Sequence, residues 1–411
     1  MRSPFIAKVD RSSANRGSSR GYAEAPDPAT LLLTRLSLAS FRAHADTVLV
    51  PSPGVNLLVG ANGAGKTNVL EAISYLGVGK SFLGASDGHV LQRGQDYFAV
   101  QGGIAGSTRA DAKLRLAFVP GEGKRAFVNG SPLERLSGLV GRLPVVVFSP
   151  ADWELTAGGP SERRRLVDST LSQAYPVYLD DLLKYRRALR QKNALLLGRR
   201  RGRSVDAATL DAWDEELAVL GGRVVQRRAV FLERLAGLLV EAHTLLGSPG
   251  DPPTLSYVPS LGDDGDEPLD RLRSGLNRTR RRSLDQGRTL VGPHLDEVRF
   301  QLAGFDLRPY ASQGQHRTFA LAVRIAQALY LFELTDERPV LLLDDVFGPL
   351  DPERTRVIVG LLVAQTLGQS FITSAQLEPF RDLVPFQDDD HVVFHVEHGT
   401  VAPLSLSSLT S

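Results

Sequence analysis

The chain has no cysteine, one methionine and two tryptophans among its 411 residues. Without cysteine, a disulfide framework, thiolate chemistry and a cysteine-ligated metal site are excluded within this sequence. No uninterrupted apolar run reaches the roughly 18 residues that a membrane-spanning helix needs, which argues against a membrane transporter chain. We therefore expect a cytoplasmic globular protein that has no membrane partner.

The sequence is also poor in lysine and nearly balanced in charge. It has seven lysines against 41 arginines, and its formal net charge is +2. The total charge therefore gives no argument for nucleic-acid binding. The arginine bias has two open explanations, which are a GC-rich genome that favours arginine codons and the use of arginine for bidentate phosphate contacts. The placement of the arginines matters more than their number.

Residues 60–67 fit the pattern G-x-x-x-x-G-K-[ST], which is typical of a phosphate-binding loop. An apolar segment at 55–59 predicts a strand before it, and apolar residues at helical spacing from Val69 to Leu76 predict a helix after it. Backbone N–H groups and the helix dipole then form an anion site. We expect Lys66 to contact the β- and γ-phosphates of ATP and Thr67 to bind Mg²⁺. The loop consists of Gly60, Ala61, Asn62, Gly63, Ala64, Gly65, Lys66 and Thr67.

A second motif, Pro339-Val-Leu-Leu-Leu-Asp-Asp345, predicts a buried parallel strand that ends in two carboxylates. In α/β sheets, ligands bind at the carboxyl ends of such strands. We expect Asp344 to hold Mg²⁺ through water, and Asp345 to orient or deprotonate the attacking water. The alternative is a pair of acids at the end of an unrelated loop. Another apolar strand predicted over 369–374 carries the hydroxyl of Thr373 near its end.

The third motif, Ser312-Gln-Gly-Gln-His-Arg317, opens a long predicted helix that continues to about Leu334. A serine and a glycine at a helix N-terminus form an anion site, but any serine-capped helix shares this weak signal. Its position 27 residues before Asp344 makes it informative. The order of the motifs is that of ATP-binding-cassette (ABC) ATPases. It consists of a P-loop, a large insert, S-x-G-Q, an apolar strand that ends in Asp-Asp, and a downstream Asp351. In those proteins the S-x-G-Q of one subunit closes on the nucleotide held by another.

The predicted fold is α/β, an ABC-type P-loop ATPase head with an antiparallel β subdomain and a helical insert that forms a second lobe. The segments follow changes in composition and periodicity. A disordered tail is predicted over 1–28, the first half of the head over 29–155, the insert over 156–288, the second half of the head over 289–404, and a short tail over 405–411.

Alternation of apolar residues predicts the strands of the β subdomain, and Asn129-Gly130 predicts a hairpin turn. In the insert, helical periodicity predicts two long helices over 161–197 and 206–246, the first capped by Ser161. A Gly/Pro/Asp-rich loop is predicted over 247–268, and strand-like sequence resumes near Thr289. The remaining predicted strands cover 31–41, 47–50, 113–119, 125–128 and 143–148.

Beyond these motifs, the sequence resembles the RecF family, the bacterial recombination-mediator ATPases of the SMC-like branch. Each matching segment is weak alone, but the ordered set over residues 31 to about 400 is highly specific. The sequence departs from the family at His316, Leu295 and Gly348-Pro349, where glutamine, a basic residue and Ser-Glu are usual. The matching segments are Leu38-Ala-Ser-Phe-Arg42, Phe148-Ser-Pro-Ala-Asp152, Gly159-Pro-Ser-Glu-Arg-Arg164, Leu166-Val-Asp168, Gly292-Pro-His294, Tyr310-Ala-Ser-Gln-Gly-Gln-His-Arg317 and Leu342-Leu-Asp-Asp-Val-Phe347.

The resemblance implies a two-lobed head, ATP-dependent homodimerisation, weak DNA-stimulated ATP hydrolysis and binding to double-stranded, gapped or junction DNA. It also implies work with RecR and RecO to place RecA on DNA, in recombinational repair and replication-fork maintenance. Lys66 and Asp345 are then catalytic residues, and Thr67 and Asp344 hold the metal. The resemblance adds further nucleotide-binding residues, which are Arg42, Ser312, Gly314, Gln315, Asp351 and Thr373.

The basic residues of the insert are the candidates for contacts with DNA phosphates. Arg186, Arg187 and Arg190 share one helix side by their spacing, and the absence of an aromatic ladder argues against a single-strand stacking platform. A solvated helix face balanced by acids such as Asp180 and Asp181 explains the row equally well on the residues alone. The resemblance favours DNA. The candidates are Arg163, Arg164, Arg165, Lys184, Arg186, Arg187, Arg190, Lys192, Arg199, Arg200, Arg201, Arg203, Arg278, Arg280, Arg281 and Arg282.

Other functions remain open at this point. An ABC-type ATPase subunit, or an SMC-like clamp with a different role in DNA maintenance, would share these motifs. A transporter ATPase would usually have histidine in place of Thr373 and glutamine after the strand that ends at Phe148. A P-loop small-molecule kinase would not need S-x-G-Q before the Asp-Asp strand.

Overall fold

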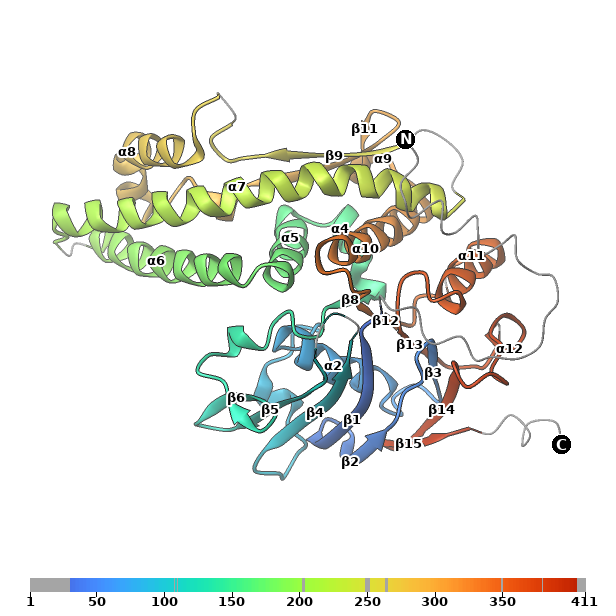
Figure 1. Ribbon diagram of the computed structural model, residues 1–411. Helices are drawn as coiled ribbons and strands as arrows, with labels where there is room; N and C mark the ends of the chain where they lie inside the picture. The colour runs from blue at the N-terminus through green and yellow to red at the C-terminus, as the bar shows by residue number, and fades with distance from the viewer. Residues whose placement is uncertain are drawn as a thin grey trace.

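In the computed structural model the described residues are 30–404, apart from 107, 109, 202–203, 248–251, 263–264, 349 and 379. The tails predicted over 1–28 and 405–411 lie outside them. Figure 1 shows two lobes, one built on β-sheets and one built mainly of helices. The sheets position the phosphate-binding loop, and the helical lobe carries the S-x-G-Q motif.

A six-stranded sheet lies at the centre of the molecule, in the strand order β15-β14-β3-β13-β12-β8. All its neighbouring strands pair in parallel except β14 and β15. Central parallel strands are buried on both faces and are therefore apolar along their length, and every residue of β12 is buried. The strands are β3 (Val55–Val59), β8 (Val145–Phe148), β12 (Val340–Asp344), β13 (Ser370–Ser374), β14 (Val392–Glu397) and β15 (Thr400–Pro403).

A second six-stranded sheet is antiparallel and has the order β2-β1-β4-β5-β6-β7. The helix α2 (Lys66–Val78) packs between the two sheets, because its apolar residues share one core with both. The predicted Asn129-Gly130 turn is confirmed, with both residues at positive φ. The strands are β1 (Leu32–Phe41), β2 (His44–Leu49), β4 (Phe98–Ala105), β5 (Ala112–Val119), β6 (Gly123–Val128) and β7 (Ser131–Pro132), and the short helix α3 covers Asp87–Val90.

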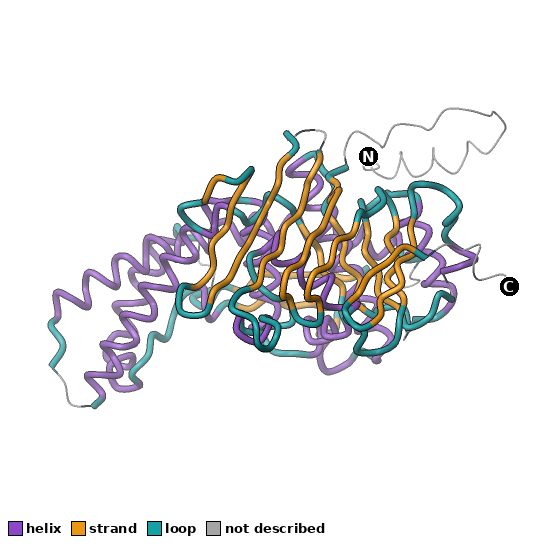
Figure 2. Tube along the Cα trace, turned by 90° about the horizontal axis from the view of Figure 1, so that it is seen from below, coloured by secondary structure: helices purple, strands orange, loops and turns teal. Residues whose placement is uncertain are grey.

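The helical lobe packs long helices beside a three-stranded sheet of order β11-β10-β9. Figure 2 shows its long helices projecting to one side of the strand-rich body. Its elements are α4 (Trp153–Ala157), α5 (Pro160–Ala174), α6 (Pro176–Arg200), α7 (Ala207–Leu245), β9 (Pro253–Val258), α8 (Pro268–Gln286), β10 (Glu297–Leu302), β11 (Phe305–Asp306), α9 (Leu307–Tyr310) and α10 (Gln313–Thr335). The chain then returns to the central sheet, which α11 (Pro352–Val363) and α12 (Phe380–Leu383) accompany.

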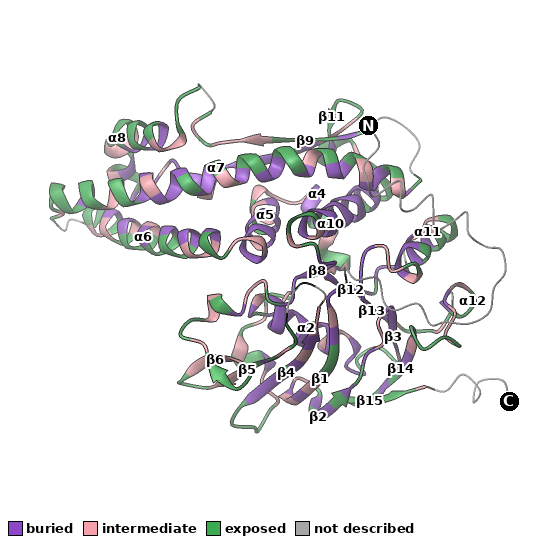
Figure 3. Cartoon of the chain, in the orientation of Figure 1, coloured by how far each residue is buried: buried purple, intermediate pink, exposed green. Residues whose placement is uncertain are grey.

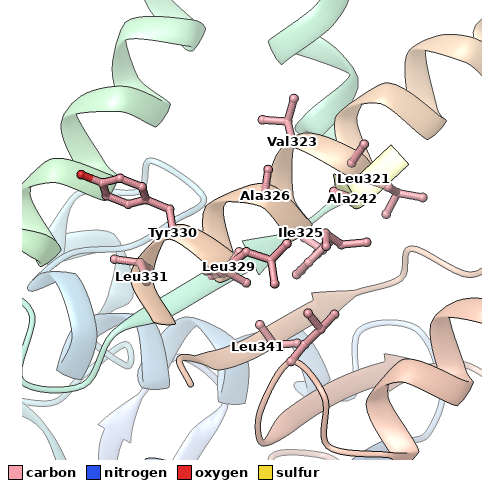
Figure 4. Packing of buried hydrophobic residues seen from close by; sticks show 14 of the residues in the cluster. Ala242, Leu321, Val323, Ile325, Ala326, Leu329, Tyr330, Leu331 and Leu341 are labelled. Atoms are coloured by element: carbon pink, nitrogen blue, oxygen red, sulfur yellow. The ribbon is translucent and has the colours of Figure 1, made fainter. Parts of the chain in front are cut away.

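The helix α10 joins the two lobes through the largest hydrophobic core. Figure 4 shows Ile325 and Leu329 of α10 packed near Leu341 of β12, and Ala242 of α7 belongs to the same cluster. By length and composition alone this helix could cross a membrane. However, 72% of its most apolar 18-residue stretch is buried inside the protein. Its hydrophobicity is therefore that of a core helix.

Several predictions about individual elements need correction. The single helix expected over 161–197 is two helices, because the chain bends between Tyr175 and Pro176, whose ring removes a backbone donor. The first of them begins after Gly159 with Pro160, so Ser161 is not its cap. The loop expected over 247–268 contains β9, and strand structure after it resumes at Glu297 rather than near Thr289. The other predicted strands and the helix after Ser312 are confirmed within a few residues.

Candidate functional site

The phosphate-binding loop lies between β3 and α2, at the edge where the parallel strands end. Gly63 and Gly65 have φ of 82° and 113°, a left-handed region that favours glycine. Gly60 lies so close to β14 that a Cβ on it would come within 2.1 Å of the Val396 carbonyl oxygen. The glycines of the motif therefore permit both the turn and the packing beneath it.

Lys66 closes over the loop that precedes it. Its Nζ donates to the carbonyl oxygens of Gly60, at 2.7 Å, and Ala61, at 2.9 Å. Burial lowers the pKa of Lys66, and the negative charges of Asp345 and Asp344 oppose this change. The ammonium group is thus held at the helix N-terminus, where an anion would bind.

Asp344 connects three elements of the site through one oxygen. Thr67 Oγ1 on α2 donates to Asp344 Oδ1 at 2.7 Å, and Thr373 Oγ1 on β13 donates to the same atom at 2.9 Å. Burial raises the pKa of the Asp344 carboxyl, while the two hydroxyl donors act against it. A hydroxyl and a carboxylate are oxygen ligands of the kind that a hard cation such as Mg²⁺ takes, so these donors fit the predicted metal.

Asp345 is exposed and has an unusual backbone. Its φ is 48°, and its backbone N–H donates to Thr373 Oγ1 at 3.0 Å. A non-glycine residue in this region is strained, and such strain concentrates at functional sites. Thr373 therefore contacts both acids, because it accepts from the backbone of Asp345 and donates to the side chain of Asp344.

A cavity of about 170 Å³ brings together five residues of the loop, Asp345 of the second motif and Thr373. Ser312, Gly314, Gln315 and Asp351 do not line it. The structure therefore joins the loop, Asp345 and Thr373 at one site and leaves the S-x-G-Q motif outside. The lining residues are Asn62, Gly63, Gly65, Lys66, Thr67, Asn68, Asp345, Thr373 and Ala375.

The S-x-G-Q motif forms a capping box at the start of α10. Ser312 Oγ accepts from the Gln315 backbone N–H at 3.2 Å, and Gln315 Oε1 accepts from the Ser312 N–H at 2.8 Å. Residues 312–315 are exposed. A second cavity, of about 520 Å³, adjoins this helix start and is lined by His316 on one side and Asp345 on another. Asp345 is thus the residue that borders both cavities.

Asp351 is the N-cap of α11. Its carboxylate accepts from the Arg354 backbone N–H and from the Arg354 guanidinium, each at 2.9 Å. The hydrogen bond from that backbone N–H lowers the pKa of Asp351. Asp351 lines neither cavity, and the departure at Pro349 lies outside the described residues.

Two residues beside the loop carried no sequence signal. Glu71 forms a bidentate ion pair with Arg42, and His44 Nε2 donates to the Gly65 carbonyl oxygen at 3.1 Å. Because a carbonyl can only accept, neutral His44 must carry its proton on Nε2, and burial lowers the pKa of His44. Glu71 is near the loop in the sequence and His44 precedes it, but neither residue belongs to the G-x-x-x-x-G-K-[ST] pattern, so no motif marks them.

Several of the predicted basic residues have internal partners. Arg163 is buried and donates to Glu297 at 2.8 Å, and buried Lys192 pairs with Asp214. These two side chains are therefore neutralised inside the protein, and their burial does not fit contact with DNA phosphates. Further members bonded to an acid or a carbonyl are Arg164, Arg165, Arg186 and Arg280.

The exposed basic residues gather on α6 and α8 of the helical lobe, where Figure 3 shows exposed residues alternating with intermediate and buried ones. The two helices meet there, because a Cβ on Gly287 would lie 3.2 Å from Arg200 Cδ. Arg203 lies outside the described residues. The members that form no ion pair within the described part of the chain are Lys184, Arg187, Arg190, Arg199, Arg200, Arg201, Arg278, Arg281 and Arg282. We call them the basic surface.

Comparisons with known proteins agree on one family. The chain matches the RecF/RecN/SMC N terminal domain over residues 32–400. It is 46% identical over 374 residues to the DNA replication and repair protein RecF of Salinibacter ruber, which covers 90% of this chain and 91% of that protein. A solved structure of the recombination mediator protein RecF with ATP, from the RecFOR pathway, has a TM-score of 0.83 at 30% identity and covers 94% of this chain and all of that one. An Smc head domain of Pyrococcus furiosus, with a TM-score of 0.52 at 17% identity over 93% of this chain and 98% of that one, shows a likeness of fold alone.

Proposed function

The chain belongs to the RecF family of DNA replication and repair proteins, and on that basis we propose that it is an ATP-dependent DNA-binding protein of recombinational repair with weak, DNA-stimulated ATPase activity. One observation carries the proposal. Thr67, Asp345 and Thr373 line a single cavity, and Asp344 accepts hydrogen bonds from both hydroxyls. The loop, the candidate metal ligand Asp344 and the candidate base Asp345 therefore lie together at the end of one parallel sheet.

In this proposal the triphosphate of ATP lies in that cavity, on the backbone N–H groups of residues 60–65 and the Lys66 ammonium. Thr67 and Asp344 hold Mg²⁺, whose charge neutralises the phosphate oxygens when it is bound. Asp345 faces the same cavity with an exposed carboxylate, so it orients the attacking water and accepts its proton. Arg42, held by Glu71 at the side of the loop, contributes a further positive charge.

We also propose that the site is completed only in a homodimer. The exposed S-x-G-Q motif at the start of α10 lies outside the nucleotide cavity of its own chain. The α10 N-terminus of a second copy would supply the missing anion contacts to the γ-phosphate. Asp351, at the surface on α11, belongs to the same proposed interface by the order of the motifs. ADP, which lacks the γ-phosphate, should not hold the dimer.

DNA is the proposed partner of the basic surface. Exposed lysines and arginines of this kind neutralise phosphates without reading bases, which suits double-stranded, gapped or junction DNA of any sequence. RecR and RecO are the proposed protein partners, with loading of RecA as the outcome, because the similar solved structure is described as part of the RecFOR pathway. These roles place the protein in the cytoplasm.

Sedimentation velocity of the full chain tests the proposal as a whole. The samples contain no nucleotide, ADP or ATP, each with and without a gapped duplex. We expect a monomer without nucleotide or with ADP, and a dimer with ATP that carries the duplex. Dimers that form equally well with ADP would contradict the composite site, and DNA binding that is insensitive to salt would contradict the phosphate contacts.

The basic surface can be tested separately. The double variant Arg187→Ala/Arg190→Ala should bind duplex DNA more weakly at every sequence, and the slope of log affinity against log salt should become shallower by about 2, since each phosphate contact contributes about 0.9. The matched control Arg115→Ala removes an exposed arginine from β5 of the other lobe and should leave the slope unchanged. Equal slopes for all three proteins would place the DNA elsewhere.

A further inference from the structure

A surface groove of about 420 Å³ lies on the helical lobe and shares no lining residue with the nucleotide cavity. The start of α6 and the middle of α7 form its walls, and Tyr330 of α10 lies in its floor. Val177 and Val230 line the groove with 60% and 64% of their surface exposed. Its volume lies within the range of roughly 300–1,000 Å³ of ordinary binding pockets.

The floor of the groove is aromatic. The hydroxyls of Tyr175 and Tyr330 lie 3.4 Å apart, and the Tyr330 ring packs edge-on against Phe231 with the ring centres 4.6 Å apart. Figure 4 shows the Tyr330 hydroxyl turned away from the core residue Leu341. Aromatic rings with hydroxyl tips offer both apolar area and hydrogen bonding, which is the composition of an interaction surface.

The rim of the groove is positively charged. The Arg227 guanidinium carbon lies 4.9 Å from the centre of the Tyr175 ring, and Arg227 forms no ion pair within the described ranges. Arg223, one turn earlier on α7, pairs with Asp181 at 3.4 Å but keeps 60% of its side chain exposed. Two guanidinium groups and one buried carboxylate, that of Asp181, thus line the groove, so it carries a net positive charge beside its apolar walls.

We propose that this groove binds a short acidic segment of a partner protein. One aromatic or branched apolar side chain of the segment inserts between Val177 and Val230, and its carboxylates lie next to Arg227 and Arg223. The charge of the rim selects acidic residues, since guanidinium groups form charge-assisted hydrogen bonds with carboxylates. The apolar walls select the aromatic or branched apolar side chain that inserts between the valines. A groove between two helices is a common docking site for peptides.

The occupant would also contact α10, the helix that begins at Ser312. Tyr330 lies near its other end, at a distance of roughly 27 Å for a rise of 1.5 Å per residue. The groove and the proposed dimer contact are therefore at opposite ends of one buried helix. Because no nucleotide-contacting residue lines the groove, binding of the segment should not require ATP, and its test is independent of the proposed function.

The absence of cysteine makes a site-specific test possible. Ala229→Cys, at an exposed position of α7 beside Val230 that does not line the groove, gives a single attachment point for an environment-sensitive bimane label on the full chain. The probes are synthetic peptides of about 12 residues, rich in aspartate and glutamate around one central phenylalanine. Matched peptides replace the phenylalanine with alanine, or every acid with lysine. A label at Val48→Cys, an exposed valine of β2, is the position control.

We expect the acidic phenylalanine peptide to change the emission of the label at 229 and not at 48, with a Kd at least tenfold lower than that of either matched peptide. Arg227→Glu should weaken this binding at least tenfold. Arg115→Glu should not, although Arg115 also lies over an aromatic ring, that of Phe127, at 5.7 Å. The Lys66→Ala background should bind the peptide normally, which separates this result from any failure of the nucleotide site.

Four outcomes would overturn the proposal. Absence of binding by every peptide, or equal binding by the acidic and lysine peptides, would rule out an acidic segment. A change of emission that depends on protein concentration without peptide would assign the groove to a second copy of the chain. Displacement of the response by free phenol alone, with no preference among the peptides, would assign it to a small aromatic ligand.

Discussion

Arg42 and Glu71 form a bidentate ion pair beside the phosphate-binding loop, in which Arg42 Nε and Nη2 each lie 2.8 Å from a carboxylate oxygen. Glu71 is fully buried on α2, five residues after Lys66, and also accepts from the Ser81 hydroxyl. The hydrogen bonds to Glu71 raise the pKa of Arg42. The buried acid therefore sets the direction of an arginine that remains partly exposed at the edge of the site.

Glu71→Gln should weaken ATP binding about tenfold, or about 1.4 kcal/mol, because the uncharged amide cannot hold both guanidinium nitrogens. We expect it also to lower the free energy of unfolding by about 2 kcal/mol, the usual range for a hydrogen bond to a charged group. Calorimetric titration with ATP and urea unfolding measure the two effects. Glu122→Gln, which alters an exposed ion pair at the turn between β5 and β6, is the control. Loss of stability with unchanged ATP affinity would show that Glu71 is only structural.

Lys66→Ala should reduce ATP affinity by a factor on the order of 100, or about 2.7 kcal/mol, because it removes the cation expected to meet the β- and γ-phosphates. Equilibrium dialysis with labelled ATP measures the change. Lys113→Ala, at an exposed position of β5, should bind ATP normally. Unchanged affinity in Lys66→Ala would contradict the assignment of the loop.

Asp345→Asn should slow ATP hydrolysis on the order of 100-fold, the usual range for a general base, while ATP affinity stays within a few-fold of normal. The amide cannot accept a proton from water, but Asp344 and Thr67 remain in place for the metal. We expect the ATP-bound dimer to persist longer in sedimentation experiments. Normal turnover would mean that another group positions the attacking water.

His294 predicts a specific loss of stability in acid. Burial lowers the pKa of His294 to about 4, and the positive charges of Arg164 and Arg228 act in the same direction. Its Nδ1 lies 2.6 Å from the Tyr185 hydroxyl. The neutral ring is therefore favoured in the folded chain. Its contribution to the free energy of unfolding is complete above pH 6.5 and is lost as the pH falls from there to about 4.

Between pH 7 and pH 5 this residue alone should lower the free energy of unfolding by about 2 kcal/mol. In His294→Gln the fall over that interval should be smaller by this amount, whatever the stability of the variant at pH 7. Urea unfolding at both pH values measures it, and His395→Gln, at an exposed histidine of β14, is the control. An equal fall in the free energy of unfolding in the unaltered protein and both variants would show that other groups cause the loss of stability in acid.

The sequence predicted the parts of the site whose chemistry is carried by short, contiguous patterns. Glycines that permit positive φ precede Lys66, and an apolar run typical of a buried strand ends at Asp344, so both could be located without the structure. Thr373 could be named because it lies near the end of another apolar run. Its contacts to both acids are visible only in the structure, since they join strands that are neighbours in the sheet but not in the sequence.

The remaining features depend on pairings that sequence patterns do not specify. Glu71 and His44 are supported by partners on other elements, and a run of arginines looks the same whether Arg163 is buried against Glu297 or free in solvent. The break at Pro176 carried a signal, but the helical periodicity on both sides of it hid the change of direction. The strand β9 was missed because glycine, proline and aspartate surround it.

Ser312 gives the sharpest test of the dimer. Its hydroxyl caps α10, and its motif lies outside the nucleotide cavity of its own chain. Ser312→Arg adds bulk at the exposed helix start and leaves the loop around Lys66 unchanged. We expect a monomer in sedimentation experiments that still binds ATP with near-normal affinity, no longer dimerises with ATP, and hydrolyses at most about 1% as fast, the range of a lost positioning contact.

Mixing Ser312→Arg with Lys66→Ala protein then separates a composite site from a self-sufficient one. In the mixed dimer one site contains both altered residues, while the other pairs a normal loop with a normal S-x-G-Q motif. Some hydrolysis should therefore return, although neither variant is active alone. If the Ser312→Arg protein hydrolysed ATP at the normal rate as a monomer, the composite site would be contradicted. All groups needed for turnover would then lie within one chain.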